Sequence, residues 1–364
     1  MPPLIYDFDF PELAARIKSW GEPKFRGQQV WDGLYKNLWT KPEEFTNLSK
    51  SLRVKMGELL TFDVLKPITT QKSKDGDTVK TLFELHDGRQ IETVLMHYAS
   101  SPTSLLQGER LKIRNTLCIS TQVGCGMGCK FCATGQMGFK RQLSSGEIVA
   151  QVIYAARALQ NEGDPSIGSG QGVLTNVVVM GMGEPFHNYE ATLEALARLN
   201  AKKGFNFGAR RFTISTVGLV PQIWRFADEG LQYNLAVSLH AAEDELRSSM
   251  LPINDKYPIN KLLEACRYYV EQTNRKITFE WALIEGVNDT PEQAHILARK
   301  LKGLLCHINA IPLNTTHNYH GRPTTSKRAQ IFKETLQDNG VSCTIREHRG
   351  IDIQAGCGQL ASRQ

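Results

Sequence analysis

Apolar residues recur at helical spacing through the first 60 residues of the chain. The positions that carry this spacing are Val30, Leu34, Phe45, Leu48, Leu52 and Met56. Asp9 stands just before Phe10 and Pro11 and is placed to cap a helix that begins there. Residues 1–60 are therefore predicted to form an N-terminal helical domain.

The pattern changes over residues 61–110, where β-rich runs are separated by two Asp-Gly dipeptides. Asp-Gly between β-rich runs is typical of tight hairpin turns, so this segment is predicted to form short hairpin strands. The segment ends in a stretch of mostly polar residues, 99–110, that is predicted to be a loop.

From Leu111 onward, β-rich and helical patterns alternate. Strands are predicted over residues 116–120, 176–181, 211–216, 233–240, 277–284, 307–314 and 342–347. Helices are predicted over 144–160, 188–200, 219–230, 258–270, 290–303 and 325–340, the first opening with a capping box from Ser144 to Glu147. The Gly-rich residues 161–172 are predicted to be a mobile loop.

This alternation implies a parallel sheet covered by helices. About six such units would close into a partial α/β barrel over residues 111–364. The polar ends of the strands would then gather at one end of the barrel, where sites form in α/β proteins.

Composition and sequence ends narrow the class of protein. The chain is 41% apolar and 22% charged, which is ordinary for a globular protein. No segment approaches 18 uncharged apolar residues, and "MPPLIYDFDF" does not resemble a targeting signal, so we expect no membrane span and a cytoplasmic location. Eight cysteines, three of them clustered, favour a metal or redox role in a reducing compartment over a disulfide framework.

The net charge of +6 is a mild indication of a polyanionic partner. Two segments concentrate this charge: residues 110–146 hold six Lys or Arg, residues 293–333 hold seven, and neither holds an acid. Such segments suit a surface that binds phosphates, and solvated helix faces explain them equally well.

The cysteine cluster carries the strongest chemical signal. Cys125, Cys129 and Cys132 have the spacing C-x3-C-x2-C, between a predicted strand and a predicted helix. Zinc sites use four ligands in paired spacing, and the next histidine is distant in sequence, so zinc is disfavoured. A 4Fe–4S cluster on three thiolates leaves one iron open, which weakens an electron carrier but serves an enzyme that binds a ligand there.

Polar residues also stand at the ends of four predicted strands. They are Gly183 with Glu184, Ser215, Ser238 with His240, and Asn314. Each alone is more often a turn or cap residue than a ligand. Together they would face one end of the barrel, where a carboxylate and closely approaching backbone could hold an ammonium group.

The C-x3-C-x2-C motif in a βα barrel resembles the radical S-adenosylmethionine (SAM) superfamily. That resemblance implies that SAM binds the open iron, and that an electron from the cluster cleaves it to a 5′-deoxyadenosyl radical. Three other cysteines, Cys266, Cys306 and Cys343, lie among apolar neighbours and are predicted to be buried packing residues.

A closer resemblance covers nearly the whole chain. The runs "STQVGCGMGCKFCATGQMGFKRQLSSGEI", "VVVMGMGEP", "FTISTVGLVP", "LAVSLHA", "IPLN" and "DIQAGCGQL" together resemble the RNA adenine-C2 methyltransferase family, which acts on 23S ribosomal RNA and, in many bacteria, on tRNA. "PKFRGQQVWDGLYKN" is similar to the N-terminal helical region of that family, which implies an accessory RNA-binding domain over residues 1–60.

The resemblance implies a role for each matching residue. Cys125, Cys129 and Cys132 would bind the 4Fe–4S cluster, and Gly183, Glu184, Ser215, Ser238, Leu239, His240 and Asn314 would contact SAM. Cys357 would be the cysteine that is methylated, Cys118 its resolving partner and Glu92 the proton acceptor.

The implied reaction consumes two SAM molecules per turnover. The first would methylate Cys357, and the radical from the second would take a hydrogen from that methyl group. The resulting methylene radical would add to C2 of adenine, and Glu92 would remove the C2 proton. Cys118 would then attack the Cys357 sulfur, which releases the RNA and leaves a disulfide for an external reductant. A monomer is expected.

Two alternatives stay open. A C8-specific 23S rRNA adenine methyltransferase of the antibiotic-resistance type shares nearly every motif, and a non-catalytic iron–sulfur RNA-binding protein would not cleave SAM. One departure concerns the 25 residues between Glu92 and Cys118, because family members are typically shorter there. This extra length includes the loop at 99–110 and loosens the placement of Glu92.

Overall fold

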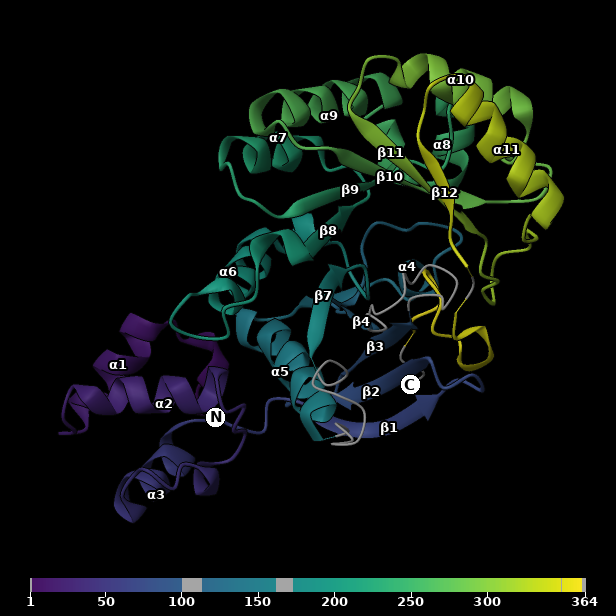
Figure 1. Cartoon of the computed structure of the whole chain (residues 1–364). Helices are drawn as coiled ribbons and strands as arrows, with labels where there is room; N and C mark the ends of the chain where they lie inside the picture. Colours follow the sequence, from purple (N-terminus) through teal and green to yellow (C-terminus); the bar gives the residue numbers. More distant parts are fainter. Residues whose placement is uncertain (1, 100–112, 162–172, 348, 362–364) are drawn as a thin grey trace, which may run out of the picture.

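The computed structural model describes residues 2–99, 113–161, 173–347 and 349–361 (Figure 1). The loops predicted over 99–110 and 161–172 lie outside these residues, apart from Ala99 and Asn161, which end a strand and a helix. Within the described ranges, no helix is long and apolar enough to cross a membrane.

Three helices form the N-terminal region, α1 (Phe10–Ser19), α2 (Phe25–Tyr35) and α3 (Lys50–Leu59) (Figure 1). The predicted cap of α1 is confirmed: the Asp9 carboxylate accepts from the Glu12 amide at 2.8 Å, and the Glu12 carboxylate accepts from the Asp9 amide at 2.9 Å. The helical conformation predicted from the spacing of Phe45 and Leu48 is wrong. Both residues are buried in non-helical chain, because Ser49 caps α3 by accepting from the Leu52 amide at 3.2 Å.

One ten-stranded sheet runs through the rest of the molecule in the order β1-β2-β3-β4-β7-β8-β9-β10-β11-β12. The strands are β1 (Lys66–Lys72), β2 (Thr78–Glu84), β3 (Gln90–Ala99), β4 (Ile113–Cys118), β7 (Leu174–Val179), β8 (Phe212–Thr216), β9 (Asn234–Ser238), β10 (Ile277–Leu283), β11 (Cys306–Pro312) and β12 (Cys343–Ile345). Strands β1 to β4 pair antiparallel, and β4 and β7 to β12 pair parallel. The predicted hairpin strands are thus confirmed, and they extend the barrel sheet.

Helices cover the outer face of the parallel strands (Figure 1). They are α5 (Ser145–Asn161), α6 (Tyr189–Asn200), α7 (Val220–Asp228), α9 (Ile259–Thr273), α10 (Pro291–Leu301) and α11 (Ser326–Asp338). All six were predicted, and the capping box of α5 is confirmed, with the Glu147 amide 3.2 Å from Ser144 Oγ. Within the described residues, the short elements α4 (Ala133–Gln136), α8 (Asp244–Met250), β5 (Gln122–Gly124) and β6 (Phe139–Gln142) were not predicted.

The core lies between the sheet and these helices. Cys266 and Cys343 are buried there, as predicted. Cys306 is only partly buried, so that prediction is wrong: it is the first residue of β11, at the edge of the covered region.

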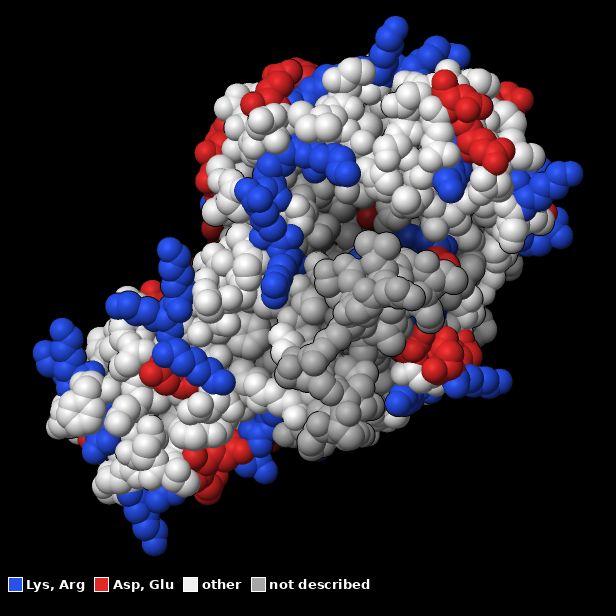
Figure 2. Space-filling view, viewed as in Figure 1, with Lys and Arg blue, Asp and Glu red and all other residues white. Residues whose placement is uncertain are grey.

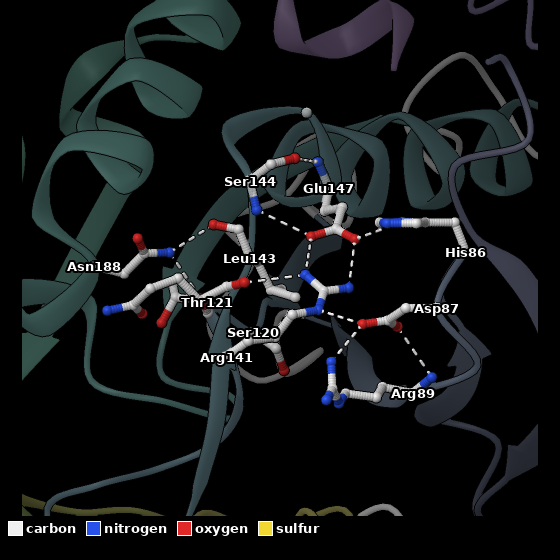
Figure 3. A network of polar contacts seen from close by, with 12 residues as sticks. His86, Asp87, Arg89, Ser120, Thr121, Arg141, Leu143, Ser144, Glu147 and Asn188 are labelled. Atoms are coloured by element: carbon white, nitrogen blue, oxygen red, sulfur yellow. Dashed lines mark hydrogen bonds and ion pairs between the residues drawn. The ribbon is translucent and has the colours of Figure 1, made fainter. Parts of the chain in front are cut away.

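A network of charged residues joins the hairpin strands to the barrel (Figure 3). The guanidinium of Arg141, on β6, contacts both carboxylate oxygens of Glu147 at 2.8 and 2.9 Å and the carboxylate of Asp87 at 2.6 Å. Glu147 lies in the first turn of α5 and is fully buried, whereas Asp87 lies in the turn between β2 and β3. Arg141 therefore fixes the β5–β6 hairpin, which flanks the cysteine loop, against two other elements.

Candidate functional site

The cysteine loop is held between β5 and β6 and the short helix α4. Gly124 has a φ of +70°, and a side chain there would clash with the carbonyl oxygen of Gly138, which directly precedes the partner strand. The Cys125 amide donates to that same oxygen at 3.1 Å. The loop can therefore turn back on itself at Cys125 only because a glycine precedes it.

The three loop cysteines line a cavity at the carboxyl ends of the parallel strands. The same cavity is lined by the predicted strand-end residues Gly183, Glu184, Ser215, Ser238, His240 and Asn314, and by Cys357. Leu239 is the exception. Its side chain is fully buried in the core, because neighbouring residues of extended chain point to opposite faces. Its amide donates to the Glu280 carbonyl at 3.1 Å.

The protonation behaviour of the three loop thiols is consistent with an iron–sulfur cluster. Burial raises the pKa of Cys125 to about 12, and burial also raises the pKa of Cys129 and of Cys132. Thiolates in such a place need a bound cation to stabilise them. Among the described residues, no three Cys, His, Asp or Glu side chains are close enough to hold one metal ion, whereas a four-iron cluster spreads three thiolates over three irons.

Glu184 places a buried carboxylate in the same cavity. It follows Gly183, whose φ of +107° and close approach to Gln122 leave no room for a side chain. The carboxylate accepts from the amides of Phe186 at 3.0 Å and Val217 at 2.8 Å. Burial raises the pKa of Glu184 to about 7, although these hydrogen bonds oppose the shift. In the described part of the chain no basic side chain pairs with it, so a cationic ligand group would complete the site.

His240 connects the cysteine loop to the barrel. Its ring Nδ1 accepts from the Ala282 amide at 2.9 Å, and its ring meets the Phe131 ring edge-on with centroids 4.9 Å apart. Burial lowers the pKa of His240 to about 3, with Arg247 adding to the effect. The imidazole is therefore neutral at physiological pH and supplies no charge to the cavity.

Cys357 lies on a segment that is fastened to the cysteine loop. The Gly358 carbonyl accepts from the Ala133 amide at 2.7 Å, directly after Cys132 in the chain. The Leu360 carbonyl accepts from the Thr134 hydroxyl at 2.6 Å, and Thr134 lies two residues after Cys132. The position of this segment thus depends on the position of the loop.

The end of β11 holds the same segment from the other side. Asn314 donates through Nδ2 to the Cys357 carbonyl at 3.1 Å, and Gln359 donates to the Thr315 carbonyl at 3.1 Å. These bonds bring Cys357, from the far end of the sequence, into the wall of the cavity.

Cys118 and Cys357 share a second cavity that adjoins the first. Cys118 is the last residue of β4, between Val94 of β3 and Val178 of β7, and both thiols are free. Burial raises the pKa of Cys118 to about 12, and the neighbouring Cys357 adds to the shift. Cys357 is exposed as a residue, yet burial raises the pKa of its thiol while Arg346 opposes that shift. Cys357 lines both cavities and therefore links them.

Glu92 does not line either cavity. On β3, it forms a buried ion pair with Lys80 at 3.0 Å, and its carboxylate accepts from the Ala361 amide at 2.9 Å. Lys80 also donates to the Gln354 carbonyl at 3.3 Å. The structure thus brings Glu92 to the Cys357 segment but not to the thiols.

Three further charged residues belong to the site and were not predicted. Arg247 is fully buried and donates to the carbonyls of Leu239 at 3.1 Å and Val217 at 2.8 Å, which joins the ends of two strands. Glu280 lines the cysteine cavity, and burial raises its pKa to about 7. Arg346 follows β12 and lines the Cys118–Cys357 cavity. Glu280 had a signal in the sequence, since it interrupts an apolar strand, and Arg346 had one as a polar strand end.

Ion pairs neutralise part of both basic segments. Arg141 pairs with Glu147 and Asp87, and Arg328 pairs with Asp289 at 2.6 Å. These acids come from outside the two segments. A segment that contains no acid in the sequence can therefore still have its positive charge neutralised in the folded protein. Residues 110–112, which begin the first segment, lie outside the described residues.

Comparison with known proteins gives matches along the whole chain. Residues 119–298 match the Radical SAM superfamily, and residues 5–61 match the ribosomal RNA large subunit methyltransferase N-terminal domain. The chain is 45% identical over 362 residues to a probable dual-specificity RNA methyltransferase RlmN of Halalkalibacterium halodurans, covering 100% of this chain and 94% of that protein. A protein with the same description from Geobacillus kaustophilus is 45% identical over 369 residues, with the same coverage.

A solved structure agrees with these matches. The crystal structure of a radical SAM methyltransferase from Sphaerobacter thermophilus superposes with a TM-score of 0.91 at 46% sequence identity, covering 100% of both chains.

Proposed function

Because the chain belongs to the RlmN family of radical SAM RNA methyltransferases, whose cofactors are a 4Fe–4S cluster and SAM, we propose that it methylates C2 of an adenine in 23S rRNA and in tRNA. One observation carries the finer part of this proposal: Cys357 lines both the cavity of the loop cysteines and the cavity that holds Cys118. That position lets a methyl carrier meet the cofactors on one side and a resolving thiol on the other.

In this proposal Cys125, Cys129 and Cys132 hold the cluster. Glu184 binds the ammonium group of SAM, and the cavity residues Gly183, Ser215, Ser238, His240 and Asn314 contact the rest of it. The side chain of Leu239 is turned into the core, so only its backbone is available for the contact that the family resemblance assigns to it. The bound cluster and SAM supply the methyl group and the one-electron chemistry, and the protein supplies position.

Cys357 acts as the methyl carrier and Cys118 as the resolving thiol. A thiol must lose its proton to be a nucleophile, and Arg346 opposes the rise in pKa that burial imposes on Cys357. The cavity that holds the two thiols has an apolar part, formed by Val94, Met96 and Ile311, and charged residues such as Arg346 complete its lining. The apolar part accepts a planar base, so the target adenine must leave its stack to enter.

Glu92 is proposed as the proton acceptor. Its carboxylate is held by Lys80 and by the Ala361 amide, so it stays with the Cys357 segment even though it lines a separate cavity. An external reductant closes the cycle by restoring the two thiols and supplying the electron. The proposed active form is a monomer in the cytoplasm, with residues 1–60 as the accessory RNA-binding domain.

The decisive experiment is anaerobic reconstitution of the cluster, addition of SAM and RNA, and location of the new methyl group by mass spectrometry. A methyl group on C2 of adenine is the expected result. A methyl group on C8 would assign the protein to the antibiotic-resistance type. SAM left intact in the reduced enzyme would point to a non-catalytic RNA-binding protein.

The affinity for SAM is expected to rise as the pH increases through about 7, because burial raises the pKa of Glu184 to about 7 and only its ionised form pairs with an ammonium group. Glu184→Gln should remove this pH dependence and weaken binding by about 10- to 100-fold. Equilibrium binding from pH 6 to pH 8 measures both effects. Glu280→Gln is the matched control, since it removes another buried carboxylate of the same cavity.

The stability of the apoprotein should change with pH in the opposite sense. A carboxyl group whose pKa is higher in the folded protein than in the unfolded chain binds its proton more tightly when folded. The contribution of Glu184 to the free energy of unfolding therefore falls as the pH rises from about 4.5 to about 7. If SAM affinity and the stability of the apoprotein both rose over this pH range, the role assigned to Glu184 would be wrong.

Thr134→Val should loosen the Cys357 segment without emptying the core, because it removes the hydroxyl that donates to the Leu360 carbonyl and keeps the shape of the side chain. Amide hydrogen exchange over residues 357–361 is expected to become about three to ten times faster. Thr134→Ser retains the hydroxyl and should exchange like the wild type. Equal exchange in the valine variant and the wild type would show that this bond does not hold the segment.

A further inference from the structure

The loop between α6 and β8, residues 201–211, gathers free positive charge. It carries Lys202, Lys203, Arg210 and Arg211, all exposed. Among the described residues none of the four takes part in an ion pair. The sequence around the loop offers no acid from residue 195 to residue 227.

Two arginines elsewhere on the barrel are engaged in a different way. Arg225 lies in the same acid-free stretch but pairs with Glu190 and Glu229. Arg157 pairs with Glu44 at 2.5 Å. The cations of the loop differ from these two because no carboxylate neutralises them, so they remain available to an anionic partner.

The loop is also well anchored beneath these side chains. Phe207 is buried and packs against the Phe205 ring at 6.0 Å and the Phe212 ring at 4.9 Å. The Phe207 amide donates to the Leu199 carbonyl at 2.9 Å, and its carbonyl accepts from Asn200 Nδ2 at 2.7 Å. A surface that is already ordered loses little conformational entropy when it binds.

The loop packs on the N-terminal helices. A side chain at Gly204 would come within 2.9 Å of the Trp31 ring nitrogen, and Trp31 is buried in α2. In Figure 2, Lys and Arg side chains gather over the region where Figure 1 places the end of α6 beside α1 and α2. The basic loop and the proposed RNA-binding domain thus form one continuous surface.

We propose that this loop binds backbone phosphates of the RNA substrate, at a distance from the nucleotide that is methylated. The inference rests on the proposed function, which makes RNA the anionic partner. The loop precedes β8, whereas Ser215 lines the cysteine cavity near the other end of that strand. A strand of this length spans about 17 Å, so the RNA must extend from the cavity mouth along the barrel to reach the loop.

The test compares the salt dependence of RNA binding, because each phosphate contact that is lost lowers the slope of log K against log salt by about 0.7 to 0.9. Lys202→Gln/Lys203→Gln and Arg210→Gln/Arg211→Gln should each lower this slope by about 1.5 and weaken binding by about tenfold. The probe is a fluorescein-labelled tRNA transcript, followed by anisotropy. Unchanged melting temperatures are expected, since the four side chains are exposed.

The matched control is Lys66→Gln/Lys72→Gln, which removes two exposed charges of β1, outside both basic segments and away from α6 (Figure 1). Its slope should stay unchanged. Unchanged slopes in both loop variants, or an equal loss in the control, would overturn the inference. Methylation by the wild type tests the proposed function separately. If the wild type methylates no RNA but the loop variants show a reduced salt slope, the loop binds RNA and the proposed reaction is wrong.

Discussion

Cys357→Ala is expected to abolish RNA methylation, with the rate lowered by at least about a thousandfold. The reason is that the variant has no sulfur to carry the methyl group, although the cysteine loop and the rest of the cavity keep their side chains. Cys118→Ala should behave differently. Bond formation between Cys357 and the base does not need Cys118, but release does, so a covalent protein–RNA adduct should accumulate.

Denaturing gel electrophoresis with labelled RNA separates these two outcomes, and mass spectrometry locates the bond on Cys357. Cys306→Ala is a suitable control, because Cys306 is a partly buried cysteine that lines neither cavity. Normal methylation by Cys357→Ala would contradict the assigned mechanism. Absence of an adduct in active Cys118→Ala would remove the resolving role alone.

Single replacement of Cys125, Cys129 or Cys132 by serine is expected to cost the protein its cluster. The loop offers three thiols to the cavity, so loss of one leaves it with two. Iron content and visible absorbance should fall severalfold, and methylation should fall with them. Cys118→Ala should keep its iron, because Cys118 lines the neighbouring cavity. A serine variant with full iron content would contradict the assignment of that residue.

The sequence predicted those parts of the fold that depend on local pattern. The long βα units were predicted because their signals, apolar spacing and helix caps such as Ser144, are contained within short stretches of sequence. The break before α3 was missed because Phe45 and Leu48 fit a helix in spacing, and only the cap at Ser49 starts the helix later. The short α4 and α8 give too few turns for a periodic pattern to show.

The candidate site was predictable where its residues form continuous motifs. Cys125, Cys129 and Cys132 share one loop, so their spacing alone indicated their chemistry. The setting of Glu92 was not predictable, because its partners Lys80 and Ala361 come from another strand and from the end of the chain. Free positive charge could not be predicted from the basic segments for the same reason. Arg328 is neutralised by Asp289, which lies outside the acid-free segment.

The anchoring of the Cys357 segment has a consequence for how this protein can diverge over time. The bonds at Cys357, Gly358 and Leu360 all end on main-chain carbonyls, which every amino acid possesses. Selection on these contacts therefore acts on the side-chain donors Thr134 and Asn314, which can change only to residues that keep a hydrogen-bond donor at the same place. The side chain of Leu360 is free of that particular constraint, but it is buried in the core, so only another apolar side chain of similar size can replace it while the reactive sulfur keeps its place.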